Sequence, residues 1–320
     1  MKSKFYNEVH VEGKLYDHDL EKKVSGASSK NPGTEYISGI IKIATDDECL
    51  NVVEVHYSYV TETNKKGVAN KTYLLLNNII EDKLHTVVGS SKAEAALVKV
   101  DSAIALNDFY TVDKNTNKET LVSVKRIEGG FLHSIGENEL NPEKSRSSFR
   151  VDMVITGCTR KEANEEKNIP EKVILKGGIF DFKKSLLPIE LSVLNSAAMD
   201  YFEGLDISNK SPVVTQLKGK IVSETVIKTI TEESAFGDPS VRTVKSTNKD
   251  YVVNWAAPEP YEWDDESSIT AQELQEAMQE REVYLADVKR RAEEYKANKN
   301  NALKNVAAPA VNAEEKMYNF

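Results

Sequence analysis

Cysteine is almost absent from this chain, and its cysteines and histidines are not clustered. Cys49 and Cys158 are the only cysteines among 320 residues. So few cysteines exclude the disulfide framework of a small secreted domain, and we expect a reducing, intracellular setting. The histidines show no zinc-binding spacing, and we interpret all of them as structural or surface residues: His10, His18, His56, His85 and His133. We therefore predict no metal site and no cofactor.

Long apolar runs and recognisable catalytic motifs are also missing. No run of about 18 apolar residues is present, and the first residues, MKSKFYNEVH, lack the apolar centre of a signal peptide, so we expect no contact with a membrane. The phosphate-binding loop GxxxxGKS/T, the nucleophile elbow and HExxH do not occur. We interpret the acidic clusters at 46–48 and 264–266 as a solvated turn and a helix start, where acidic side chains are favoured. The prediction is a protein without catalytic residues, not an enzyme.

An excess of basic residues is lacking too, since the formal net charge is -9. The acidic excess is concentrated at the end of the chain: residues 258–320 hold 14 acidic and 8 basic residues, and the rest holds 37 acidic and 34 basic residues. A nearly neutral body can still present a locally basic groove, because the local field attracts a phosphate chain. Net charge neither excludes nor proves a nucleic-acid partner.

The chain is rich in apolar residues spaced two apart, which is the period of half-buried strands. The clearest strand is 51–60, NVVEVHYSYV, with Val53, Val55, Tyr57 and Tyr59 on one side. Either this set is buried, or its tyrosines cap the open face of a barrel. Further strands are expected at 7–16, 35–44, 97–110, 119–135, 149–159, 212–225 and 241–255, with two more inside 171–195. Short helices are expected at 71–80 and 195–205, and a flexible loop at 17–34.

The two halves of the chain repeat one plan: three strands, a short helix and two more strands, with glycines inside the strands. This order is typical of the OB-fold, a small, partly open β-barrel whose outer face binds oligonucleotides. A β-sandwich could show the same pattern. We predict a mainly β protein with minor α content, made of two OB-fold-like β-barrel domains, at 1–136 and 148–257, and a C-terminal α-helix.

The end of the chain differs in kind from the strands. Thr270-Ala271-Gln272-Glu273 is a capping box that starts a helix over 270–298, within a segment from 258 to 298. An apolar stripe along the helix predicts packing on its own domain or self-association as a coiled coil, and Arg281 interrupts that stripe. Residues 299–320 are predicted to be a flexible acidic tail. The tail could dock on partner proteins or occupy the protein's own basic groove, through Glu314, Glu315, Tyr318 and Phe320.

The most informative stretch for function is 171–195, EKVILKGGIFDFKKSLLPIELSVLN. Gly177-Gly178 suit a bend in a strand, and Phe180 and Phe182 follow at a spacing that would put them on one face. Aromatic rings beside cations can stack unpaired bases and neutralise phosphates, although strand aromatics are also common in cores. Aromatic residues with basic neighbours recur along the chain, and the candidate site for single-stranded DNA comprises Tyr57, Tyr59, Lys125, Arg126, Phe131, Arg150, Arg160, Lys176, Phe180, Phe182, Lys183 and Lys184.

Several segments together resemble the single-stranded DNA-binding proteins of tailed bacteriophages: GIFDFKKSLLPIELSVLN, DYFEGL, ESAFGDPSVR, WAAPEPYEWDDES and the acidic, Phe-terminated tail. The resemblance covers about residues 5–298 and implies an OB-fold protein that coats unwound phage DNA in the host cytoplasm during replication and recombination. It also implies that the tail recruits replication proteins, although Lys316 interrupts this tail. Two other functions stay open: a phage structural or assembly protein made of β-sandwich domains, and a strand-annealing recombination factor.

Overall fold

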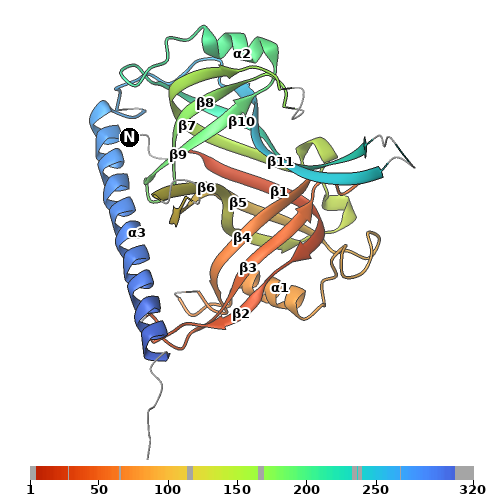
Figure 1. The fold of residues 1–320 in the computed structure, drawn as a ribbon. Coiled ribbons are helices and arrows are strands. Elements are labelled where there is room, and N and C mark those ends of the chain that lie inside the picture. Colours follow the sequence, from red (N-terminus) through yellow and green to blue (C-terminus); the bar gives the residue numbers. More distant parts are fainter. Residues whose placement is uncertain are drawn as a thin grey trace, which may run out of the picture. The chain divides into compact units, whose positions relative to one another are not determined.

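The computed structural model describes residues 5–27, 29–64, 66–113, 118–164, 169–232, 236, 240–266 and 268–306. Strands dominate the described part of the chain, and Figure 1 follows them from red to cyan. The strands are β1 (Asn7–His18), β2 (Glu21–Val24), β3 (Glu35–Ala44), β4 (Val52–Thr61), β5 (Leu97–Val112), β6 (Glu119–Ser134), β7 (Ser147–Lys161), β8 (Lys172–Phe180), β9 (Leu186–Val193), β10 (Val213–Glu232) and β11 (Ser240–Ala256). The α-helices are α1 (Lys71–Ile80), α2 (Ser196–Glu203) and α3 (Ala271–Val306). Single turns of 3₁₀-helix occur at Glu137–Glu139 and Glu143–Ser145.

The first half of the chain closes into a barrel. Strand β1 pairs antiparallel with β3, and β3 pairs antiparallel with β4. Strand β4 then pairs parallel with β6, β6 lies next to β5, and β5 returns to β1 in antiparallel pairing. Helix α1 connects the third and fourth of these five barrel strands. This five-stranded barrel, hereafter the first barrel, has the architecture of the OB-fold.

The second half repeats the same circuit. Strand β7 pairs with β8, β8 with β9, β9 in parallel with β11, β11 with β10, and β10 with β7. Helix α2 again connects the third and fourth strands. These five strands form the second barrel. The predicted class, mainly β with two OB-like barrels and a C-terminal helix, is therefore confirmed.

One continuous sheet of 11 strands runs through both barrels. The link is the antiparallel pairing of β1 with β7, in which Val9 lies opposite Phe149. The segment 17–34, expected as a loop, contains the short strand β2, which pairs with the edge of β3 through backbone hydrogen bonds. The side chains of β2 are exposed and mostly polar, so this strand has no apolar alternation by which it could be predicted. The domain boundaries at 136 and 148 stay a prediction.

Bulges decide which aromatic side chains lie inside the barrels. In β4, Val53, Val55 and Tyr57 are buried in alternation. Beyond them the pairing with β3 shifts register, because Gly39 lies opposite Tyr57 whereas Ile37 lies opposite Val60. The extra residue turns Tyr59 to the outside, and Val60 packs on the core again. The four residues expected on one face are therefore separated: Val53, Val55 and Tyr57 lie inside the barrel, and Tyr59 lies outside.

A second apolar cluster lies on the outer surface of the second barrel. Val154, Phe180, Leu186 and Val214 from the barrel strands are covered there by the chain that follows β11. The covering residues are Ile269 and Ala277, with Tyr261, Trp263, Leu274 and Phe5 at the margin. The start of α3 is fixed as predicted by a capping box, because Thr270 Oγ1 accepts from the Glu273 backbone N–H and Glu273 Oε2 accepts from the Thr270 N–H.

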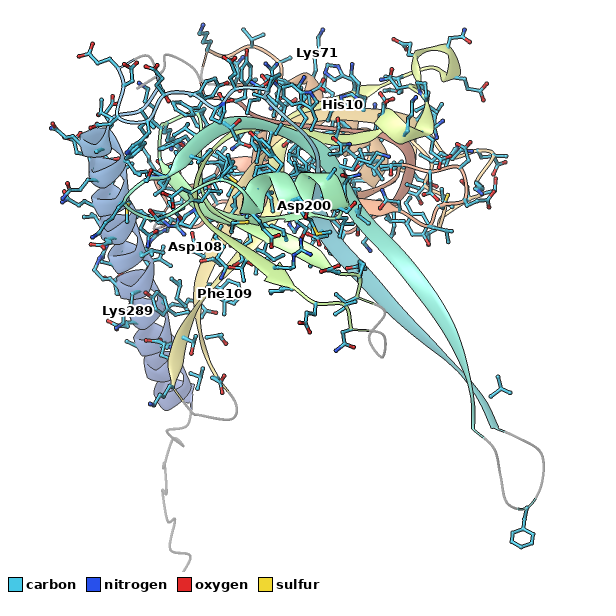
Figure 2. All side chains as sticks on the ribbon, turned by 90° about the horizontal axis from the view of Figure 1, so that it is seen from above. His10, Lys71, Asp108, Phe109, Asp200 and Lys289 are labelled. Atoms are coloured by element: carbon cyan, nitrogen blue, oxygen red, sulfur yellow. The ribbon has the colours of Figure 1, made fainter. Side chains whose placement is uncertain are left out.

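The chain divides into two compact units, and both barrels belong to the first, which comprises residues 1–106 and 125–277. The second comprises residues 107–124 and the residues from 278 onward, and is hereafter the hairpin–helix unit. Within it, the far end of the β5–β6 hairpin runs beside α3, as Figure 2 shows for the stretch labelled Asp108 and Phe109 and the helix labelled Lys289. Arg281, which interrupts the apolar stripe, bonds Asp108 at 2.6 Å.

Candidate nucleic-acid interface

The turn between β8 and β9 presents an aromatic ring and two lysines to solvent. Asp181 organises the turn, since its Oδ1 accepts from the backbone N–H groups of Lys183 and Ser185, both at 2.8 Å. Phe182 is 91% exposed, and the Lys183 Nζ lies 5.5 Å from the centre of its ring. Lys184 adopts a left-handed backbone conformation, with φ of 66°. We call Phe182, Lys183 and Lys184 the Phe182 turn.

Phe180 does not belong to the exposed site that the sequence predicts. It is only 1% exposed, and its ring packs against Phe5 in the outer cluster of the second barrel, with 5.1 Å between ring centres. Strand β8 ends at Phe180, so the two-residue alternation that would put Phe180 and Phe182 on one face stops between them. Phe180 is a packing residue and is not available to stack on a base.

Tyr57 requires a second correction, because it is 2% exposed and belongs to the barrel core. Burial raises the pKa of its hydroxyl. Tyr59, two residues later, lies on the outside and stacks on Tyr36, with 4.5 Å between ring centres and 34° between ring planes. Phe131 is also exposed. No ring contact among the described residues joins Tyr59 or Phe131 to Phe182.

Three of the expected cations are already engaged by the protein. Lys125 donates from Nζ to the Glu190 carbonyl oxygen, and burial lowers the pKa of its ammonium group. Arg126 forms an ion pair with Glu128. Arg160 is held by three carboxylates, those of Glu203, Glu171 and Asp200, at 2.7, 3.0 and 3.3 Å. A phosphate would have to displace these partners, so Lys125, Arg126 and Arg160 stabilise the fold instead of presenting unpaired charge.

Lys176 and Arg150 occupy intermediate positions. Lys176 is exposed on β8, 3.5 Å from Glu190 across the strand pair. Arg150 lies on β7 with its guanidinium carbon 3.4 Å from the centre of the Tyr6 ring, and Glu8 is 4.0 Å away. Both cations remain accessible to a ligand at the barrel surface, in contrast to Lys125.

Sequence reasoning missed Lys218 and Trp255. The Lys218 Nζ lies 4.2 Å from the centre of the Trp255 ring, on the outside of the second barrel. The two residues are distant in sequence and meet through the pairing of β10 with β11. The sequence offered one indication of a cationic surface here: in KGK at 218–220, two lysines are spaced to share one face of a strand, with a glycine between them.

The described part of the chain was also compared with the geometry of a metal site and of a membrane span. Within it, no group of three or more His, Cys, Asp or Glu side chains is arranged to hold a metal ion. None of the helices described has the length and apolar character needed to cross a membrane. The expected tail residues Glu314, Glu315, Tyr318 and Phe320 lie outside the described residues.

Comparison with known proteins identifies the family of the chain. The model of the YorF family matches residues 6–291, so the chain belongs to the YorF family. No curated protein matches the chain. A solved structure of a deletion mutant of the single-stranded DNA binding protein from Thermus aquaticus is similar, with 9% sequence identity and a TM-score of 0.45 over 82% of this chain and 99% of that chain.

Proposed function

We propose that this protein binds single-stranded DNA without sequence preference and without catalysing a reaction. The observation that carries the proposal is the Phe182 turn on the surface of an OB-type barrel. An exposed phenylalanine ring does not stabilise the fold by burial. As a stacking platform it can contribute about 1–3 kcal/mol per base to the binding free energy of single-stranded DNA. Lys183 and Lys184 follow Phe182 in the turn and supply charge for the phosphates next to a stacked base.

The first barrel supplies a second element of the same kind. The stacked pair of Tyr36 and Tyr59 lies on the outer face of β3 and β4, which are the second and third strands of that barrel. Oligonucleotides bind OB-folds on this face. Tyr59, Phe131, Phe182, Lys176, Lys183, Lys184 and Arg150 therefore form the proposed contact set.

The finer features of the function are part of the same proposal. The segments that resemble phage proteins favour the coating of phage DNA during replication and recombination in the cytoplasm of a host cell. Helix α3 extends to Val306, so residues 299–306 belong to the helix and not to the flexible tail predicted at 299–320. The rest of the predicted tail is proposed to dock on replication or recombination proteins, and the helix predicted at 270–298 to allow self-association. The two OB-like domains are proposed to span 1–136 and 148–257.

Fluorescence anisotropy of labelled oligo-dT of about 30 nucleotides tests the proposal. We expect tight binding that weakens as salt rises and that ignores a duplex competitor. Replacing Lys183 by Gln and Lys184 by Asn, which tolerates the left-handed conformation, is expected to reduce the salt slope by about 0.7 for each phosphate that the protein no longer neutralises. Lys210→Gln, an exposed lysine distant in sequence from the turn, is the control. Absence of binding at low salt would contradict the proposed function.

A further inference from the structure

A row of cationic and aromatic side chains crosses three strands of the second barrel. Lys218 on β10 lies directly opposite Arg150 on β7 and directly opposite Trp255 on β11. Residues opposite one another on neighbouring strands project from the same face, with their Cβ atoms about 4.5–5.5 Å apart. Arg150, Lys218 and Trp255 are thus adjacent on the outer face, and Lys220 lies two residues along β10 on the same exposed side. We call these four residues the Trp255 row.

A bulge puts Trp255 on the outside. Tyr251 and Val253 are buried inside the barrel, and continued alternation would bury Trp255 as well. Instead the pairing shifts: Gly219 lies opposite Val253, whereas Lys218 lies opposite Trp255. One extra residue enters β11, Trp255 becomes 40% exposed, and Ala256 packs on the core again.

Gly219 makes this bulge possible. A Cβ atom at position 219 would lie 2.1 Å from the Val252 carbonyl oxygen and 2.5 Å from the Phe149 ring. Only glycine allows the two backbones to approach so closely. Bulges commonly re-aim a side chain beside a functional site, and this one places a large aromatic ring in solvent next to a lysine.

Among the described residues, the two lysines of the row have no anionic partner, and Arg150 has one. No carboxylate of the described residues forms an ion pair with Lys218 or Lys220, whereas Glu8, directly opposite Arg150 on β1, pairs with it at 4.0 Å. Like charges directly opposite each other on adjacent strands, such as Arg150 and Lys218, are destabilising. A bound anion would relieve this repulsion.

We propose that the Trp255 row is a second contact for single-stranded DNA, in which a base stacks on Trp255. Lys218 and Lys220 join Arg150, which already belongs to the proposed contact set, in binding the adjoining phosphates. This inference rests on the proposed function. A single strand fits the row because it supplies flat rings and regularly spaced negative charges together. The row lies on β7, β10 and β11, whereas the Phe182 turn joins β8 and β9, so a long strand could contact the second barrel at two places.

The tryptophan content of the chain allows a direct test. Trp255 and Trp263 are the only tryptophans, and Trp263 packs at the margin of the outer apolar cluster, next to the start of α3. In the full chain carrying Trp263→Phe, the tryptophan emission, excited selectively over that of the tyrosines, therefore comes from Trp255 alone. Titration with oligo-dT is expected to quench this emission, with saturation at the same protein-to-DNA ratio at which the anisotropy signal saturates.

Substitutions separate stacking from charge. Trp255→Ala is expected to weaken binding of long oligo-dT by about 5- to 150-fold, and the pair Lys218→Gln and Lys220→Gln to lower the salt slope by about 1.4. Lys210→Gln, which removes the positive charge of an exposed lysine outside the row, should change neither quantity. The fluorescence measurement needs no change at Trp255, so it holds even if Trp255→Ala disturbs the bulge.

The outcomes distinguish the inference from the function on which it rests. If anisotropy shows binding but the Trp255 emission does not respond, the inference is overturned, and the row is left as a surface for another anion such as an acidic peptide. If anisotropy shows no binding at low salt, the proposed function itself fails. Quenching that disappears in the variant with Lys218→Gln and Lys220→Gln supports the inference.

Discussion

Arg281 and Asp108 form a buried ion pair within the hairpin–helix unit. The Arg281 Nη2 donates to the Asp108 Oδ1 at 2.6 Å, and the two side chains are only 10% and 1% exposed. The Ser123 hydroxyl donates to the same carboxylate oxygen at 2.6 Å. Arg281, which breaks the apolar stripe of α3, therefore has a structural role, because it neutralises the buried carboxylate of Asp108.

Removal of one partner of this pair should open the hairpin–helix unit. We expect Asp108→Ala to cost about 3–5 kcal/mol of local stability, because it leaves a buried guanidinium without its charge partner. Hydrogen exchange of residues 107–113 and 278–297 measures this effect. The double variant Asp108→Leu with Arg281→Met should recover much of the stability.

The exposed pair of Lys296 and Glu119 is the control, and Glu119→Gln should leave hydrogen exchange unchanged. Equal exchange in all variants would contradict this role of the buried pair.

Phe180 and Phe182 should respond in opposite ways to truncation. Phe182→Ala is expected to weaken binding of single-stranded DNA by about 1–3 kcal/mol and to leave the melting temperature unchanged, because the ring is exposed. Phe180→Ala is expected to lower the free energy of unfolding by about 3–5 kcal/mol, because it leaves a cavity under Ile269 and Ala277. DNA titration and urea denaturation of both variants separate the two roles. An unchanged affinity in a folded Phe182→Ala protein would remove the turn from the proposed contact set.

Tyr57→Phe should stabilise the first barrel. The Tyr57 hydroxyl is buried without a hydrogen-bond partner among the described residues, and a buried unsatisfied polar group costs free energy. We expect the free energy of unfolding to rise by up to about 2 kcal/mol, measured by urea denaturation. Tyr59→Phe, in which the exposed ring loses the same atom, should show no change. A less stable Tyr57→Phe protein would mean that the hydroxyl is hydrogen-bonded after all.

Stability should fall in acid through Asp250. Burial by itself would raise the pKa of this carboxyl group, but hydrogen bonds from Lys172 Nζ at 2.6 Å and from the Ser192 hydroxyl outweigh it and hold the pKa below its usual value. A lowered pKa in the folded state means that the unfolded chain binds the proton more readily. The contribution is thus complete above the ordinary aspartate pKa of about 3.9 and is lost as the pH falls through the lowered folded value.

The variant Asp250→Asn tests this assignment. Its free energy of unfolding should depend less on pH below about 4 than that of the natural chain, as measured by denaturation in a series of acidic buffers. Asp200→Asn removes an exposed carboxylate near Arg160 and serves as the matched control. Identical acid profiles for the natural chain and Asp250→Asn would assign the loss of stability to other carboxylates.

Local alternation in the sequence was sufficient to predict the barrel strands and the order of the elements. The strands at 35–44 and 119–134, the helix at 71–80 and the capping box at Thr270 lie where the pattern predicts them, because half-buried strands and helix starts depend on residues close in sequence. Strand β2 was missed, since it is held by backbone hydrogen bonds and its side chains are exposed.

The tertiary structure decided which side chains face solvent. Tyr57 and Tyr59 look equivalent in the sequence, as do Tyr251, Val253 and Trp255. One inserted residue in β4 and another in β11 place the residues beyond them on the opposite face of the sheet. The position of such a bulge depends on where a partner strand, distant in sequence, offers a glycine such as Gly39 or Gly219. Long-range pairing also decides the partners of the cations: Arg160 binds three carboxylates, whereas Lys218 lies over the indole ring of Trp255. The sequence therefore determined the fold and the types of residue in the candidate site, and the long-range register determined which of these side chains are exposed.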